Sequence, residues 1–249
     1  MNKYVIKQQI GRGSFSITRY GVNVDTKETV AFKMVSKANI RDYNLIRNEI
    51  DTHKNLNHNG IIKYIESIIT EKEAYIIMEY AANGNMYSHI VKFGRLTPEL
   101  TKIYVIQIIS AIKYLHNNNI IHRDIKSDNI LITDNNLCKI CDFGLSILAA
   151  DDEYLDEYVG SPLYMAPELH KKQIKYNHKI DVWALGIVTY EMLHGFTPFE
   201  THDADELTTN VMYKHIHYPR VICHWLKNLI NMTLTKNMLE RPNINDILM

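Results

Sequence analysis

The periodicity of the apolar residues changes once along the chain, near residues 81–85. Between residues 4 and 80, short alternating or apolar runs are separated by turn residues, a pattern typical of antiparallel strands, and only residues 44–56 interrupt it with a helical pattern. After residue 85, apolar residues recur with helical spacing. The sequence therefore predicts an α+β fold with two lobes: a small antiparallel sheet with one helix, and a larger, mainly α-helical lobe.

The clearest helix signal begins at Thr97. Thr97 supplies an N-cap, Pro98 takes the first helical position, and Glu99 places an acid in the first turn. Apolar residues then follow with helical spacing at Ile103, Ile106, Ile109, Ile112 and Leu115. Three asparagines at 117–119 end the pattern. Short strands are expected between 120 and 142, and helices beyond 168.

The 249-residue length fits one domain, with an N-lobe at 1–80, a hinge at 81–85 and a C-lobe at 86–249. Lys+Arg and Asp+Glu both number 28, so the net charge is zero, which argues against nucleic acid or an anionic membrane as a partner. No N-terminal segment resembles a signal peptide, and polar residues interrupt the apolar runs. We expect a monomeric intracellular protein, cytoplasmic or nuclear.

Cys138 and Cys141 form a CxxC pair, a spacing that can indicate a metal or redox site. The surrounding LCKICDF alternates like a strand, which would send the two thiols to opposite faces. A structural zinc site needs four ligands, and the third cysteine, Cys223, is far away in the sequence. We therefore expect three reduced thiols and no zinc.

A glycine pair, Gly11 and Gly13, lies between two strand-like runs in IGRGSFSITRYG, where backbone N–H groups can approach a phosphate closely. A strand rather than a helix follows the pair, and no Gly-Lys-Ser/Thr is present, so neither a Rossmann fingerprint nor a P-loop is met. Farther on, Lys33 leaves an apolar strand. Taken alone, such a lysine extends its charge to solvent.

Two later stretches carry more specific motifs. His122-Arg123-Asp124 is followed by Asn129 and then by Asp142-Phe143-Gly144, and in this order and spacing they resemble the catalytic and metal-binding loops of protein kinases. The resemblance covers essentially the whole chain. Its other matches are the glycine pair, Lys33, Glu49, Ala166-Pro167-Glu168, Asp181-Val182-Trp183 and Arg241-Pro242.

The resemblance implies ATP and Mg²⁺ as cofactors and transfer of the γ-phosphoryl group to protein substrates. Lys33 would hold the α- and β-phosphates and would itself be oriented by Glu49. Asn129 and Asp142 would bind Mg²⁺, since a hard cation prefers oxygen ligands.

For the acceptor side, the resemblance implies that Asp124 accepts or aligns the proton of the substrate hydroxyl. Lys126 resembles the lysine that serine/threonine kinases place beside the γ-phosphate, which indicates Ser or Thr acceptors. Glu168 and Arg241 would form a buried structural ion pair. The adenine ring would lie between the lobes, among Ala31, Met78, Glu79, Ala81 and Leu131.

Ser16 and Thr18 depart from the family pattern, in which a third glycine and a valine are usual. Ser16 stiffens the loop and Thr18 makes the ceiling of the pocket less apolar, so weaker ATP binding is expected. The catalytic and metal-binding residues are all present, which favours an enzyme over a catalytically weak or dead kinase-fold scaffold or decoy. A small-molecule kinase is disfavoured by GSPLYMAPE, which resembles a peptide-docking segment.

The stretches near 160 and 198 are most similar to those of polo-like, autophagy-initiating and Aurora-type kinases. The abundance of isoleucine and asparagine suggests an AT-rich genome, such as that of a protist or a large DNA virus. For a viral protein, the intracellular location would be the host cell.

An acidic run, DDEYLDEY at 151–158, falls in the activation segment implied by the resemblance. Four residues before Ser161, the position that is usually phosphorylated holds Glu157. We expect Glu157, aided by Asp156, to pair with Arg123 and order the segment without phosphorylation, giving a largely constitutive kinase. The alternatives are a solvated acidic loop, or autophosphorylation on Tyr154, Tyr158 or Ser161.

Overall fold

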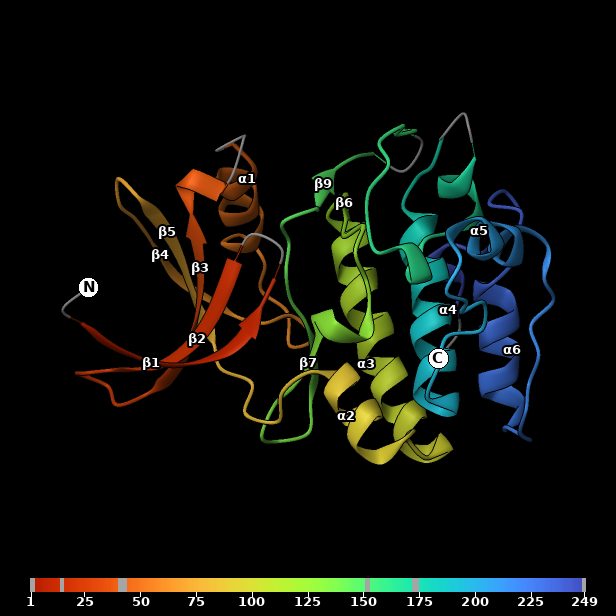
Figure 1. Cartoon of the computed structure of the whole chain (residues 1–249), viewed down its shortest axis with the longest axis horizontal. Coiled ribbons are helices and arrows are strands. Elements are labelled where there is room, and N and C mark those ends of the chain that lie inside the picture. The colour runs from red at the N-terminus through yellow and green to blue at the C-terminus, as the bar shows by residue number, and fades with distance from the viewer. Residues whose placement is uncertain (1–2, 14–15, 40–43, 151–152, 172–174, 248–249) are drawn as a thin grey trace.

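The structure, a computed structural model, describes residues 3–13, 16–39, 44–150, 153–171 and 175–247. Figure 1 shows a sheet with one helix at one end of the molecule and a group of helices at the other. This arrangement confirms the predicted two-lobed α+β fold. The first lobe contains β1 (Tyr4–Arg12), β2 (Ser16–Asn23), β3 (Thr29–Ser36), α1 (Asn44–His53), β4 (Tyr64–Ile69) and β5 (Glu73–Glu79).

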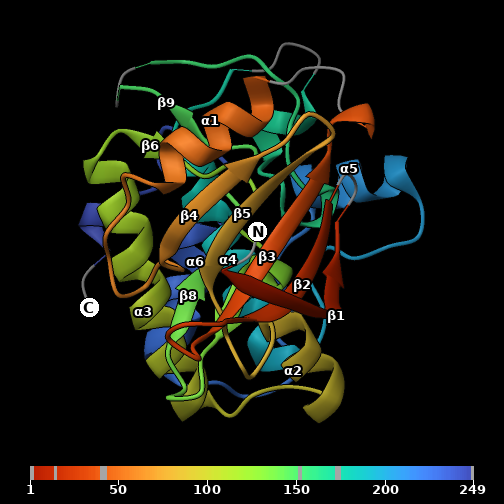
Figure 2. The ribbon, with the colours of Figure 1, turned by 90° about the vertical axis from the view of Figure 1, so that its left-hand side faces the viewer.

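The five strands form one antiparallel sheet in the order β1-β2-β3-β5-β4. Figure 2 shows this sheet from the end of the molecule, with α1 beside it. The register sets Thr18 opposite Lys33 and Ala31 opposite Met78. The strands after the glycine pair, around the lysine and before the hinge are therefore neighbours in the centre of the sheet.

The second lobe is mainly helical. Its α-helices are α2 (Met86–Phe93), α3 (Pro98–Asn117), α4 (Lys179–His194), α5 (Ala204–Tyr213) and α6 (His224–Thr233). Its short strands are β6 (Ile120–Ile121), β7 (Ile130–Ile132), β8 (Cys138–Ile140) and β9 (Ile147–Leu148). Five 3₁₀ turns complete the described elements of the chain: Lys37–Asn39, Ser127–Asn129, Pro162–Tyr164, Pro167–His170 and Ile244–Asp246.

The start and end predicted for α3 are confirmed. The Thr97 side chain accepts the Leu100 N–H at 3.3 Å, Pro98 is the first helical residue, and the helix ends at Asn117. Hydrogen bonding by the cap satisfies an N–H group that has no partner within the helix. The prediction for α1 was correct at its start and three residues too long at its end, which lies at His53.

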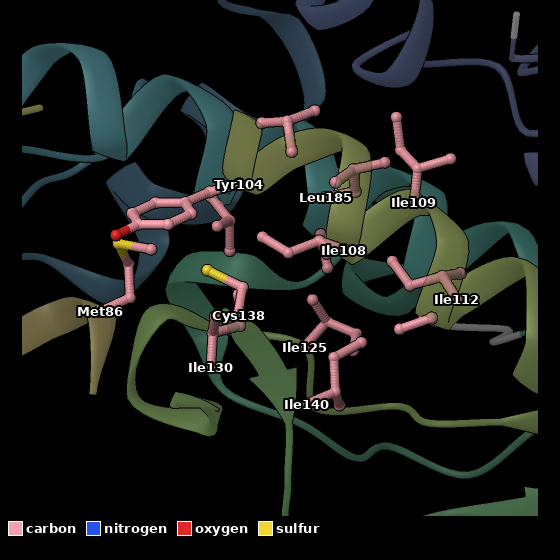
Figure 3. Close-up of a cluster of buried hydrophobic side chains, with 14 of the residues drawn as sticks. Met86, Tyr104, Ile108, Ile109, Ile112, Ile125, Ile130, Cys138, Ile140 and Leu185 are labelled. Atoms are coloured by element: carbon pink, nitrogen blue, oxygen red, sulfur yellow. The ribbon is translucent and has the colours of Figure 1, made fainter. Parts of the chain in front are cut away.

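The main core of the second lobe lies between α3, α4 and the β7–β8 hairpin. Figure 3 shows the side chains that meet there, and the labelled ones are Met86, Tyr104, Ile108, Ile109, Ile112, Ile125, Ile130, Cys138, Ile140 and Leu185. Burial of each large apolar side chain contributes about 1.5–3 kcal/mol relative to exposure. The loops that flank β7 and β8 are therefore anchored in this buried core.

The two cysteines of the CxxC pair lie in different environments, as the alternation predicted. Cys138 packs in the core of the second lobe, whereas Cys141 packs against the cluster beneath the sheet. All three cysteines are free, and burial raises the pKa of the Cys138 and Cys141 thiols. Within the described ranges, no group of three or more His, Cys, Asp or Glu side chains could hold a metal ion.

Among the described helices, none combines the length and the apolar character that a membrane span requires.

Candidate active site

The loop at residues 122–129 is held in place by Asp181, in the first turn of α4. The Asp181 carboxylate accepts the His122 and Arg123 N–H groups at 2.9 and 3.0 Å, and His116 Nε2 lies 2.9 Å from it. Arg123 has φ 66°, a left-handed conformation that is costly for a residue with a side chain. The buried Asp181 therefore stabilises a strained turn of the loop.

The charge of Asp181 is itself stabilised by its contacts. Burial acts to raise the pKa of this carboxyl, but the hydrogen bond to His116 and the nearby His122 lower it by more. A carboxylate that stays ionised in the core can keep accepting hydrogen bonds from the loop.

Three other predicted site residues bond to the carboxylate of Asp124. Lys126 Nζ lies 2.7 Å from Oδ2, and Asn129 Nδ2 donates to Oδ2 at 3.0 Å and to the Asp124 carbonyl at 2.9 Å. The Ser161 hydroxyl donates to Asp124 Oδ1 and accepts from Lys126, both at 2.8 Å. The sequence placed Ser161 among regulatory residues, but here it contacts the candidate base directly.

Lys33 lies between two carboxylates from different parts of the chain. Its Nζ is 2.6 Å from Glu49 Oε1, on α1, and 2.7 Å from Asp142 Oδ1, which follows β8. Burial acts to lower the pKa of Lys33, but the two carboxylates outweigh burial and raise it. Burial likewise acts to raise the pKa of Asp142, but Lys33 lowers it to about 2. Lys33 and Asp142 are therefore charged near neutral pH, whereas burial raises the pKa of Glu49 in spite of the nearby Lys33.

The oxygen atoms of Asn129 and Asp142 suit a hard divalent cation. The amide nitrogen of Asn129 is used in the bonds to Asp124, and only Oδ1 of Asp142 bonds to Lys33, so each side chain keeps an oxygen. Mg²⁺ is usually held by one or two protein oxygens together with substrate phosphates and waters. The donor set present here fits that ion.

The residues predicted to surround adenine come together beneath the sheet. Ala31, Met78 and Ala81 belong to one buried cluster, and Leu131 packs against it from the second lobe. For Glu79, whose backbone groups the resemblance places against adenine, the structure shows a partner for the N–H group. Its N–H already donates to the Lys63 carbonyl at 2.9 Å, so that N–H is not available to adenine.

The Glu79 carboxylate also has partners. It lies 2.7 Å from Lys139 Nζ, on β8, and accepts the Lys63 N–H at 3.1 Å. The side chain thus links the two lobes behind the hinge.

The glycine loop is compact at its described end. The Gly13 N–H donates to the Ser16 carbonyl at 2.9 Å, and a Cβ on Gly13 would lie only 2.9 Å from Ser16 Oγ. Gly11 pairs with Thr18 across β1 and β2. A side chain at position 13 would therefore require the Ser16 hydroxyl to move.

The Arg123 side chain bonds to Glu157 of the activation segment and to two other parts of the chain. Its guanidinium lies 2.6 Å from Glu157 Oε2, 3.0 Å from the Tyr176 hydroxyl and 2.6 Å from the Leu145 carbonyl. Asp156, expected to aid Glu157, makes no hydrogen bond or ion pair within the described part of the chain. The first two acids of the predicted run, at 151–152, lie outside the described residues.

A chain of aromatic rings connects α1 to the loop at 122–129. His53 packs against Tyr64 and Phe143, with ring centroids 5.6 and 5.0 Å apart, and Phe143 packs against His122 at 5.3 Å. Nε2 of His53 lies 2.7 Å from the Ile62 carbonyl. This stack holds the helix that carries Glu49 close to the candidate catalytic loop.

The sequence pointed to Asp181 only as part of the Asp181-Val182-Trp183 match, without a role, and it did not single out His53. For Asp181, a usable signal for its role was an acid in the first turn of α4, a helix rich in apolar residues, since a buried acid needs hydrogen-bond partners. For His53, the signal was its position four residues after Glu49, on the same helix face. Tyr176, which bonds to Arg123, had no signal in the sequence.

Glu168 and Arg241 form a bidentate ion pair in the core of the second lobe. Arg241 donates to the two Glu168 oxygens at 2.7 and 2.9 Å, and it also donates to the Thr235 and Lys179 carbonyls at 3.0 Å. The arginine is completely buried. The pair connects the residues after the activation segment to the end of the chain.

Comparisons with known proteins agree with this geometry. A family model described as the protein kinase domain matches residues 4–249. CBL-interacting serine/threonine-protein kinase 26 of Arabidopsis thaliana is 32% identical over 254 residues, which cover 100% of this chain and 58% of that protein. Probable serine/threonine-protein kinase MARK-A of Dictyostelium discoideum is 32% identical over 251 residues, covering 100% of this chain and 24% of that protein.

A third relative is CBL-interacting protein kinase 11 of Oryza sativa subsp. japonica, which is 30% identical over 250 residues, covering 98% of this chain and 50% of that protein. The chain thus spans between 24% and 58% of the length of these three relatives. None of their names indicates a polo-like, autophagy-initiating or Aurora-type kinase, so that finer assignment stays a prediction. Because the family match extends over nearly all residues, the chain belongs to the protein kinase domain family.

Proposed function

We propose that this protein transfers the γ-phosphoryl group of ATP, with Mg²⁺, to serine or threonine hydroxyls of protein substrates. The observation that carries the proposal is the position of Lys33, within hydrogen-bonding distance of both Glu49 and Asp142. Phosphoryl transfer depends mainly on positioning and on neutralisation of charge. The Lys33 ammonium group is oriented by Glu49 on α1 and lies beside Asp142, a candidate metal ligand. It would therefore supply both the positioning and the neutralisation of charge.

The other residues have complementary roles in this proposal. Asn129 and Asp142 would hold Mg²⁺, which neutralises phosphate charge when it is bound. Asp124 would accept the proton of the substrate hydroxyl, and Lys126 would balance the charge of the transferred group. Lys126 bonds to both Asp124 and Ser161, which supports a role beside the acceptor hydroxyl.

The test is transfer of labelled γ-phosphate from Mg·ATP to a library of peptides with Ser, Thr or Tyr acceptors. We expect label on Ser and Thr peptides and none when EDTA removes the divalent cation. The library also reports which flanking residues are preferred. Label confined to tyrosine would contradict the proposed acceptor class, and no transfer to any peptide or to a generic basic protein would favour a scaffold or decoy.

We further propose that Glu157 lets the kinase act without phosphorylation of its activation segment. Support comes from the ion pair between Glu157 Oε2 and Arg123 Nη1, which lie 2.6 Å apart. Arg123 itself has the left-handed backbone conformation that Asp181 stabilises. Glu157 is 58% exposed whereas Arg123 is 8% exposed, so solvent weakens the pair at one end. A carboxylate also carries one charge where a phosphate carries nearly two. The contact would therefore replace a phosphate only in part.

Replacement of Glu157 by glutamine tests this role. In phosphatase-treated protein, we expect kcat/KM to fall by about threefold to tenfold, since a charge-assisted bond contributes roughly 1 kcal/mol at a partly exposed site. Asp156→Asn is the matched control. It removes the same charge at the neighbouring residue, whose carboxylate makes no hydrogen bond or ion pair in the described structure. Equal activity of Glu157→Gln and wild type, both phosphatase-treated, would show that the pair does not activate the kinase.

A further inference from the structure

Three segments that are distant in the sequence meet where α2 and α4 end. α2 ends before Gly94 and α4 before Gly195, and a Cβ on Gly195 would come within 2.1 Å of the Gly94 carbonyl oxygen. The Tyr190 hydroxyl donates to the His217 carbonyl at 2.7 Å, which attaches the segment after α5 to the same place. Residues 93–96, 194–196 and 217–220 therefore contribute to one surface.

Two arginines make this surface positive. Arg95 and Arg220 are exposed, as is His217 beside them, and within the described residues no carboxylate lies at ion-pairing distance from either arginine. The carbonyl groups at the C-terminal ends of α2 and α4 together act as a partial negative charge of only about half an elementary charge per helix, which does not cancel the two arginine charges. Because the chain as a whole has a net charge of zero, the positive charge here is a local feature.

Aromatic rings lie beside these charges. Phe196 is 46% exposed, and behind it His194, only 4% exposed, packs on Tyr190 with ring centroids 4.2 Å apart. Phe196 and Tyr218 lie 6.2 and 6.3 Å from the His194 ring. Neither ring nitrogen of His194 has a hydrogen-bond partner in the described structure.

The protonation state of His194 reflects the same surroundings. Burial, followed by the charges of Arg220, Arg95 and His217, lowers its pKa to about 4. At neutral pH the ring is therefore uncharged, and it adds aromatic surface beside the two arginines. Every charged group that shifts this pKa is basic, which agrees with a positive local potential.

We propose that this basic aromatic surface, formed by Arg95, Phe196, His217 and Arg220, binds an acidic segment of a partner protein that carries an aromatic side chain. Carboxylates of the segment would pair with Arg95 and Arg220, and its aromatic ring would pack on Phe196. Exposed ion pairs contribute only about 0.2–1 kcal/mol each, so the aromatic contact is needed for measurable affinity. The proposal does not depend on phosphoryl transfer.

The test uses the whole chain and a fluorescein-labelled peptide of aspartate and glutamate with two phenylalanines, followed by fluorescence anisotropy. We expect saturable binding that weakens as salt rises, because exposed pairs are screened. The double variant Arg95→Gln/Arg220→Gln should bind about tenfold more weakly, and Phe196→Ala about threefold more weakly. Arg95→Lys/Arg220→Lys keeps the charges and should retain most of the binding.

Lys27→Gln/Lys72→Gln is the matched control, since both lysines are exposed in turns of the first lobe and their removal changes the net charge equally. Unchanged binding by Arg95→Gln/Arg220→Gln would overturn the proposal, and so would equal binding of a peptide with alanine in place of phenylalanine. Displacement of the peptide by heparin or phosphatidylserine vesicles at equal charge concentration would also overturn it, because the surface would then select only negative charge.

Discussion

Replacement of Asp124 by asparagine is expected to lower kcat by about 10²–10⁴-fold, the usual contribution of a positioned general base. Asparagine keeps the shape of the side chain and can still contact Ser161 and Asn129. It cannot accept a proton, and it removes the negative charge beside Lys126. Steady-state kinetics with a Ser/Thr peptide found in the library would measure the loss.

The same variant separates catalysis from binding. ATP affinity, measured by calorimetry in the presence of Mg²⁺, should be nearly unchanged, because none of the contacts of Asp124 involves Lys33 or Asp142. Asp134→Asn is the control, since Asp134 is exposed in a turn and carries the same charge. A kcat of Asp124→Asn equal to that of wild type would remove Asp124 from the mechanism, and a large loss of ATP affinity would assign it to nucleotide binding instead.

The sequence predicted those features of the fold that depend on residues within a single helix or strand. The Thr97 cap and Pro98 fix the start of α3 because they satisfy or avoid N–H groups within one turn of the helix. The alternation in residues 4–80 predicted the strands for a similar reason, since side chains alternate between faces. Strand order is not a local property, and only the structure shows that β5 lies between β3 and β4.

The candidate site was predictable as a set of residues but not as a set of contacts. The motifs named Asp124, Lys126 and Ser161 separately, whereas their triangle of hydrogen bonds requires the chain to return to the same point after 35 residues or more. The same limit applies to Arg123, whose contact with Tyr176 depends on packing between distant segments. The spacing of the motifs indicates which catalytic groups are present, whereas tertiary packing determines which of these groups are in contact.

Removal of the Glu168 carboxylate should have the largest effect on stability. Glu168→Ala leaves the guanidinium of Arg241 buried without its ionic partner, which is expected to lower the free energy of unfolding by about 3–5 kcal/mol. The carbonyls of Thr235 and Lys179 would still accept hydrogen bonds, but neither carries a charge to balance the arginine. Urea denaturation followed by circular dichroism would measure the change.

Two further variants identify the cause of that loss. Glu168→Leu combined with Arg241→Met replaces the ion pair by apolar side chains, and it should recover most of the stability, because the large cost arises from an unpaired buried charge. Glu240→Gln changes an exposed carboxylate next to Arg241 in the sequence and should alter stability by less than about 0.5 kcal/mol. If the double variant were as unstable as Glu168→Ala, the loss would come from disrupted packing between the activation segment and the end of the chain.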